Sequence, residues 1–178
     1  LISTNPIAGF KFTDFTKAKI QPKPSRLRAV QLEDVIGDLA AGFDREPQDC
    51  MLALMMLCHG TRVGETRMAR WAHLTLGEQG EWFIPAENTK TRCEHRLPLT
   101  HQVCALLERY RDWQAAKGYK GAFVFPARGG GCLSDSQACA VFTRLGRGEW
   151  TSHDLRKVAR TGWTDLGVDF LIGEMLVN

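Results

Sequence analysis

The chain has 178 residues, of which 44% are hydrophobic and 24% charged, and this composition suits one globular domain with a substantial core. A formal net charge of +3 permits a nucleic-acid partner but does not by itself indicate one. The longest apolar run, residues 50–58, is too short to span a bilayer, and no signal-like segment opens the chain, so we expect a soluble, cytoplasmic protein with no membrane partner. The six cysteines follow no zinc or disulfide spacing, so we expect reduced thiols and no metal site.

Residues 1–28 are expected to form a basic interdomain linker, and residues 29–178 one domain. The first stretch is interrupted by prolines and glycine and shows no sustained apolar period. Five basic residues in it have no acidic residue among them and could follow a phosphate backbone: Lys17, Lys19, Lys23, Arg26 and Arg28. A merely solvated linker is an equally good interpretation of the same residues.

Helical periodicity begins at residue 31 and continues to residue 42. Apolar residues recur there at three- and four-residue spacing: Leu32, Val35, Ile36 and Leu39. Pro47 then marks the start of a second helix, which has almost no polar face up to Leu57 and should therefore be the buried centre of the core. A short helical stretch after Gly60 is expected to reach Trp71.

The segments 74–76, 82–84 and 96–99, with turn residues between them, predict a small antiparallel sheet. Further helices are expected at 101–117, 134–145, 152–166 and from 169 onward, with a short strand at 123–125. The predicted fold class is mainly α with a small antiparallel β-sheet, of the α+β type.

Three separated segments carry residues that can bind and activate a phosphate: HGTRVGE at 59–65, TKT at 89–91 and SHDLR at 152–156. In this order they resemble the tyrosine recombinase (phage integrase) family. The catalytic domain of that family carries an arginine in a T-G-x-R-x-x-E type motif, a lysine on a β-turn and H-x-x-R on a later helix. The resemblance runs from about residue 31 to the end and includes the segments 69–71, 82–85, 97–99 and 124–126. No single motif is specific, but the ordered set is, and it implies a fold like that catalytic domain.

The resemblance assigns the two arginines of these motifs, Arg62 and Arg156, to the scissile phosphate. Guanidinium groups bind the non-bridging oxygens bidentately and remain charged while negative charge builds up on the phosphate. Glu65 follows Arg62 by three residues, so its carboxylate could hold that guanidinium in place. We therefore expect a pair of arginines supported by one carboxylate.

Proton transfer is assigned to Lys90 and His153. Lys90, on the predicted hairpin, would protonate the departing 5′ oxygen, with Arg92 as the alternative if the hairpin boundary shifts. His153 lies three positions before Arg156, so both would project from one helix face toward the same phosphate. His153 would transfer a proton or contact the phosphate.

Two further basic groups flank the motif positions and should contact DNA phosphates. The first comprises Lys90, Arg92 and Arg96, and the second Arg144, Arg147, Arg156, Lys157 and Arg160. The expected partner is therefore double-stranded DNA carrying attachment sites, whose base sequence cannot be read from these residues.

The family's nucleophilic tyrosine lies downstream of H-x-x-R, after a second histidine or tryptophan, whereas no tyrosine follows Arg156 in this chain. Tyr110 and Tyr119 both precede the motif, and we expect a half-buried helix residue and a loop aromatic rather than a nucleophile. The nucleophile is thus expected to be missing from this fragment, which should be inactive in cleavage.

The resemblance implies site-specific recombination in a phage or genomic-island integrase, by strand cleavage and rejoining through a 3′-phosphotyrosyl intermediate, without a metal or nucleotide cofactor. The full-length protein would act as a tetramer on two DNA sites in the cytoplasm of a bacterial host, with accessory DNA-bending or directionality factors as further partners. Two alternatives stay open: a DNA-binding relative that has lost catalysis, and a type IB topoisomerase that uses the same arginine, lysine and histidine chemistry as a monomer.

Overall fold

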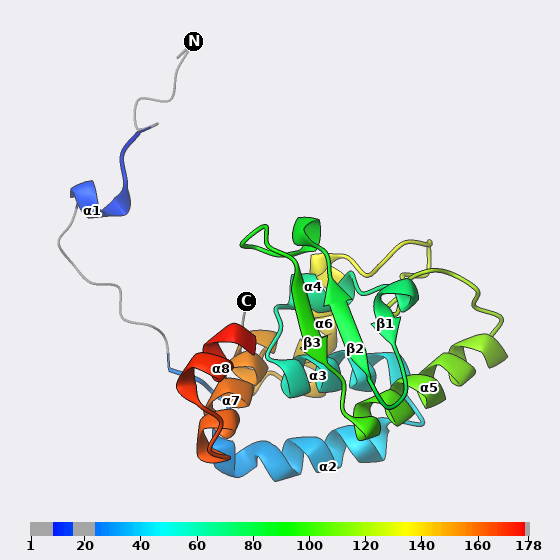
Figure 1. The fold of residues 1–178 in the computed structure, drawn as a ribbon. Helices are drawn as coiled ribbons and strands as arrows, with labels where there is room; N and C mark the ends of the chain where they lie inside the picture. Colours follow the sequence, from blue (N-terminus) through cyan, green and yellow to red (C-terminus); the bar gives the residue numbers. More distant parts are fainter. Residues whose placement is uncertain (1–8, 16–23, 177–178) are drawn as a thin grey trace.

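The structure is a computed structural model that describes residues 9–15 and 24–176. Figure 1 shows helices surrounding one central helix, with a small sheet on one side of it. The helices are α1 (Phe12–Phe15), α2 (Leu32–Gly42), α3 (Pro47–His59), α4 (Val63–Arg67), α5 (His101–Ala116), α6 (Asp135–Leu145), α7 (Ser152–Asp165) and α8 (Phe170–Leu176), and the 3-10 turns are η1 (Ala29–Gln31), η2 (Trp71–His73) and η3 (Ala86–Asn88). The strands are β1 (Leu74–Thr75), β2 (Glu81–Ile84) and β3 (His95–Pro98). The predicted fold class, mainly α with a small antiparallel sheet, is confirmed.

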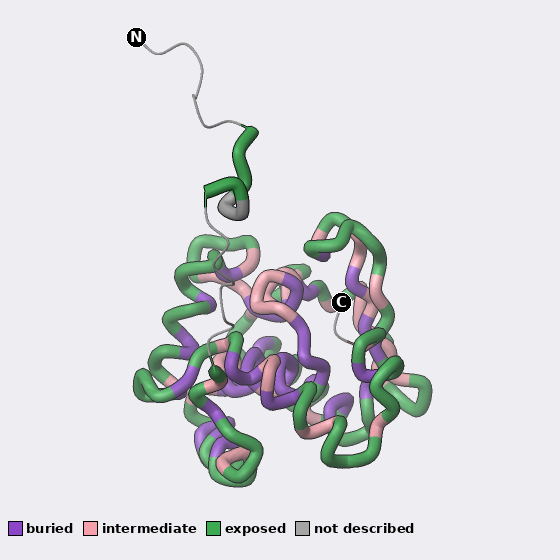
Figure 2. Tube along the Cα trace, turned by 90° about the vertical axis from the view of Figure 1, so that its left-hand side faces the viewer, coloured by how far each residue is buried: buried purple, intermediate pink, exposed green. Residues whose placement is uncertain are grey.

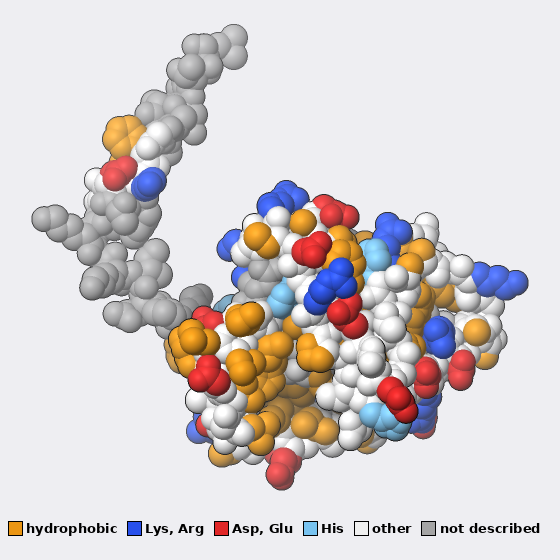
Figure 3. Space-filling model, viewed as in Figure 1, with side chains coloured by type: hydrophobic (Ala, Val, Ile, Leu, Met, Phe, Trp, Pro, Cys, Tyr) orange, Lys and Arg blue, Asp and Glu red, His pale blue; other side chains and the backbone are white. Residues whose placement is uncertain are grey.

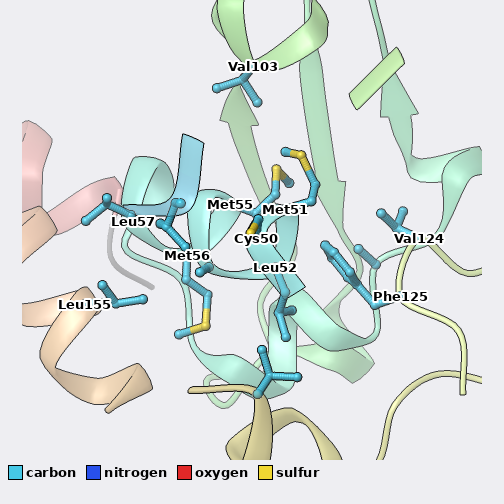
Figure 4. Packing of buried hydrophobic residues seen from close by; sticks show 14 of the residues in the cluster. Cys50, Met51, Leu52, Met55, Met56, Leu57, Val103, Val124, Phe125 and Leu155 are labelled. Carbon is cyan, nitrogen blue, oxygen red and sulfur yellow. The ribbon is translucent and has the colours of Figure 1, made fainter. Parts of the chain in front are cut away.

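Helix α3 is the centre of the core, as its nearly continuous apolar sequence predicts. Pro47 stands at its start, where a missing N–H is tolerated, and Gly60 ends it in the left-handed conformation with φ of 59°. The helix contacts α2, α5, α6 and α7, so it has neighbours on every side. Figure 4 shows Leu155 of α7, Val103 of α5 and Phe125 lying on different sides of it. Figure 2 shows these buried segments gathered in the interior.

The sheet is a three-stranded antiparallel meander in the order β1-β2-β3. Trp82 of β2 pairs with Leu74 and with Leu97, and the buried side chains alternate with more exposed ones along β2. The connection between β2 and β3 spans residues 85–94 and contains η3. This connection, rather than a strand, carries Lys90.

The strand predicted at residues 123–125 was wrong. Phe123 forms only an isolated bridge with Arg70, and the Val124 nitrogen donates a hydrogen bond to the Ala69 carbonyl at 2.9 Å. Pro126 follows at once and has no N–H with which to extend a ladder. Val124 and Phe125 are fully buried, so the apolar run serves core packing rather than a sheet.

The last residues of the expected linker, 1–28, pack against the domain. Leu27 is only 2% exposed and packs in the core, and residues 12–15 form the short helix α1. Lys17, Lys19 and Lys23 lie outside the described residues. At the other end, α8 exposes apolar side chains, and hydrophobic atoms are dense on that part of the surface (Figure 3). Within the described ranges, no helix is long and apolar enough to cross a membrane.

Candidate phosphate-binding site

The loop after α3 places Arg62 and fixes its direction. Gly60 turns the chain, and Arg62 stands immediately before α4 rather than inside a helix with Glu65. One carboxylate oxygen of Glu65 accepts from the Arg62 backbone nitrogen at 2.8 Å, and the other accepts from its guanidinium Nη1 at 2.9 Å. Glu65 is 2% exposed while the Arg62 side chain is 33% exposed. A buried carboxylate therefore holds a guanidinium that is partly exposed.

Arg156 comes from α7 and reaches the same loop. Its Nη1 donates a hydrogen bond to the carbonyl oxygen of Gly60, two residues before Arg62. Burial lowers the pKa of Arg156 from its usual value, and the positive charge of Arg62 lowers it further, partly opposed by Glu65. Two like charges are thus close together at a partly buried place, an arrangement that a bound anion such as phosphate relieves.

His153 lies in the first turn of α7, three residues before Arg156, so the helix predicted for both residues is confirmed. Asp154 and Leu155 between them are buried, whereas His153 is exposed. Residues three apart on a helix are neighbours on its surface. The imidazole is therefore available to a ligand that approaches the Arg156 side of α7.

Lys90 is exposed on the connection between β2 and β3, in agreement with its predicted place on a hairpin loop. The adjacent Thr89 is buried, and its hydroxyl lies 3.0 Å from the Ala86 carbonyl oxygen and 2.8 Å from that of Cys93. Arg92 adopts a positive φ of 59° and donates to the carbonyl oxygen of Glu87 at 3.2 Å. Arg92 thus braces the turn, whereas the side chain of Lys90 is exposed.

Three of the other predicted DNA contacts lie on β3, beside η1 and on α7. Arg96 lies on β3, pairs with Glu81 at 2.6 Å and stacks 4.6 Å above the Phe83 ring. Arg28 is exposed beside η1, and Lys157 is half-buried next to Arg156 on α7. Of these residues, Lys157 is the one that shares a helix with Arg156.

Arg144 is not brought to the site. It pairs with Asp49 and lies 4.0 Å from Glu46, both at the start of α3. Gly60 ends that 13-residue helix, about 20 Å away at a rise of 1.5 Å per residue. The structure therefore separates Arg144 from Arg62 and Arg156.

Two supporting residues were missed from the sequence. Arg67 of α4 donates to Asp135 at 2.7 Å and to the Leu133 carbonyl at 2.8 Å, which joins the short helix beside Arg62 to α6. Asp154 accepts hydrogen bonds from Thr151 and from Arg26. The T-x-x-D spacing of Thr151 and Asp154 is a helix-start signal that could have revealed half of this arrangement.

Neither tyrosine is placed as a nucleophile. Tyr110 is fully buried rather than half-buried, its hydroxyl donates to the Val124 carbonyl at 2.8 Å, and burial raises its pKa. The Tyr119 hydroxyl donates to the Phe123 carbonyl at 3.0 Å. Both hydroxyls thus stabilise the segment around residue 124. In the part of the chain that the structure describes, no group of three or more His, Cys, Asp or Glu residues is arranged to hold a metal ion.

Comparison with known proteins decides the family. The sequence profile of the phage integrase family matches residues 25–171, which include all three motifs. This chain belongs to the phage integrase family. Among curated relatives, the prophage integrase IntA of Escherichia coli K12 is 27% identical over 156 residues, which cover 86% of this chain and 36% of IntA. The chain thus spans about a third of the length of that relative.

Solved structures agree on the fold of this chain. The XerH site-specific recombinase in its pre-cleavage complex with difH superposes with a TM-score of 0.71 at 16% identity, covering 86% of this chain and 47% of that one. A lambda integrase from a tetramer bound to a Holliday junction superposes with a TM-score of 0.65 at 18% identity, covering 99% of this chain and 51% of that one. At such identities the likeness establishes the tyrosine recombinase catalytic-domain fold, and the predicted family and fold are confirmed.

Proposed function

We propose that this chain is the phosphate-activating part of a tyrosine-type DNA recombinase that cuts and rejoins strands at specific sites. The observation that carries the proposal is the meeting of Arg62 and Arg156 on the loop that ends α3. Their segments are far apart in sequence, and the like charges lie close together with one buried carboxylate as support. The non-bridging oxygens of a phosphodiester are the group that this arrangement best accommodates.

In the proposed reaction, Arg62 and Arg156 bind the two non-bridging oxygens and stabilise the charge that develops on them. A tyrosine oxygen, supplied from outside residues 1–178, attacks phosphorus and forms a 3′-phosphotyrosyl bond as the bond to the 5′ oxygen breaks. Lys90 gives its proton to that departing oxygen, and the proton that the tyrosine hydroxyl loses passes to His153 or to solvent. His153 otherwise contacts the phosphate. Attack by a 5′-hydroxyl reverses these steps and rejoins the strand without ATP.

The proposed setting is prophage or genomic-island integration and excision in the cytoplasm of a bacterial host. Double-stranded attachment sites would lie along the exposed Lys90 turn and the Arg156 side of α7, and the complete protein would work there as a tetramer. Support comes from the prophage integrase among the relatives and from the DNA complexes named for the structural neighbours. Accessory DNA-bending or directionality factors belong to the same proposal.

Binding of a labelled DNA duplex by this chain tests the arginine pair. We expect Arg62→Ala and Arg156→Ala each to raise Kd about 10-fold or more, since a charge-assisted hydrogen bond contributes about 1.5–3 kcal/mol. Arg109→Ala is the matched control, because Arg109 is an exposed arginine already paired with Asp44. Its Kd should change less than about 3-fold, as expected for a surface ion pair. Site variants that bind as tightly as the control would contradict the proposal.

Covalent capture separates the proposal from its alternatives. On a nicked duplex that traps a phosphotyrosyl product, we expect this chain to bind DNA and leave no covalent band in a denaturing gel. A covalent product mapped to Tyr110 or Tyr119 would overturn the assignment, since both hydroxyls are engaged within the fold. Relaxation of supercoiled plasmid by this chain would instead favour a type IB topoisomerase.

A further inference from the structure

Asp154 joins two parts of the chain that are distant in sequence. Its Oδ1 accepts from the Arg26 backbone nitrogen at 3.0 Å and from the Ser25 hydroxyl at 3.2 Å. Its Oδ2 accepts from the backbone nitrogen and the hydroxyl of Thr151, at 3.0 and 2.8 Å. The residue is 5% exposed. One buried carboxylate thus holds both the start of α7 and the segment that enters the domain.

These contacts favour the charged form of Asp154. Burial raises its pKa, but the hydrogen bonds from Arg26, Thr151 and Ser25 together outweigh that effect and lower the pKa below the usual value of 3.8. Its place in the first turn of α7 adds the favourable field of a helix N-terminus. At neutral pH the group is therefore an anion that accepts four hydrogen bonds.

The entering segment carries two exposed arginines. Leu27 is buried in the core between them, and η1, which follows Arg28, packs against α7. Arg26 and Arg28 are both exposed, and neither side chain forms an ion pair with another described residue. Because Asp154 lies two residues before Arg156, its bond to Arg26 ties this pair of cations to the helix that carries half of the phosphate site.

We propose that Asp154 is a positioning residue that sets the distance between the Arg26–Arg28 pair and the site of Arg62 and Arg156, so that one DNA duplex contacts both. This inference rests on the proposed DNA binding. A carboxylate that only capped α7 would stabilise the helix and leave the two arginines independent of it. The two roles differ in the number of phosphates that the protein neutralises at once.

The salt dependence of DNA binding counts those phosphates. For duplex DNA, log K falls with log salt by about 0.9 for each phosphate contact. We expect Asp154→Ala to reduce the slope by about 1.8 if both Arg26 and Arg28 lose their contacts. The double variant Arg26→Ala/Arg28→Ala should give the same reduction, and the triple variant no more. Asp154→Asn, whose Oδ1 can still accept from Arg26, should recover part of the slope.

Thr151→Ala is the matched control, because it removes one bond to Asp154 on the helix side and leaves those to Ser25 and Arg26. It should lower the free energy of unfolding by about 1 kcal/mol and leave the slope unchanged. If Asp154→Ala does not fold, Asp154→Asn is compared with the arginine double variant instead, and it should lose only part of the slope that the double variant loses.

The outcomes distinguish the inference from the function on which it rests. Failure of the unmodified chain to bind DNA would overturn both. DNA binding with an unchanged slope in Asp154→Ala, or slope losses that add in the triple variant, would overturn the positioning role alone. A shared, non-additive loss of slope supports it.

Discussion

The two ends of helix α3 use arginine in opposite ways. At its start, Arg144 pairs with Asp49 and Glu46, and Arg109 of α5 pairs with the nearby Asp44. At its end, Arg62 and Arg156 lie close together, and the buried carboxylate of Glu65 pairs with Arg62. One end therefore pairs each of these arginines with surface carboxylates, and the other brings two arginines together.

This contrast explains why a count of basic residues does not locate a phosphate site. Arg144 belongs to a cluster of cations in the sequence, yet its neutralising partners lie nearly a hundred positions earlier. What distinguishes Arg62 and Arg156 is that folding brings the two arginines close enough together for one to lower the pKa of the other. The following experiments change first the carboxylate of Glu65 at the end of α3, then the carboxylates that pair with Arg144 at its start, and last Asp154 of α7.

Replacement of Glu65 should have the largest effect. Glu65→Gln keeps an acceptor for the Arg62 backbone nitrogen but removes the charge that faces the guanidinium. We expect the free energy of unfolding in urea to fall by about 1–3 kcal/mol, because a buried charge-assisted bond is lost. Glu46→Gln, at the exposed pair with Arg144, should change it by less than about 1 kcal/mol. Equal losses would show that the two ends do not differ.

Removing the two carboxylates that pair with Arg144 should create a second, weaker anion site at the start of α3. In Glu46→Gln/Asp49→Asn, the guanidinium of Arg144 loses both of its carboxylates. We expect DNA affinity at low salt to rise several-fold and the salt slope to steepen by about 0.9, as for one added phosphate contact. Adding Arg144→Ala to this variant should reverse both changes. A slope that stays constant would mean that neutralisation is not what separates the ends.

Acid should weaken the fold through Asp154, with the smallest effect of the three. Its pKa is lowered in the folded state, so its contribution to stability is complete above the unfolded value near 4 and is lost as the pH falls through the folded pKa. Urea unfolding at pH 5, 4 and 3 should therefore show a steeper loss for the unmodified chain than for Asp154→Asn. Parallel curves would contradict this assignment of the titrating group.

Much of the fold was readable because local signals agreed with the tertiary structure. Pro47 begins α3 as predicted, and the apolar residues at 82–84 placed β2. The error at residues 123–125 arose because an apolar run reports burial and does not say whether a neighbouring strand exists. The start of a helix could thus be predicted from a single residue, whereas the pairing of a strand depends on residues that are distant in the sequence.

The candidate site was predictable only in its motif residues. Arg62, Lys90, His153 and Arg156 stand in segments whose order resembles a family, and their catalytic roles stay predictions. Supporting contacts were harder to see, since Arg67 reaches Asp135 and Asp154 reaches Arg26 across long stretches of sequence. No local pattern encodes such pairs, because each depends on how two helices pack.

Because α7 packs against α3, the arginine pair forms late when the protein folds during synthesis. Residues 152–165 are made about a hundred positions after residues 47–59, yet the contact between these helices brings Arg156 to Gly60. Closing so long a loop is slow and must await the later helix. A nascent chain that has released only α2 to α6 from the ribosome therefore holds Arg62 without its partner. Affinity for a phosphate should accordingly appear only once helix α7 has been made.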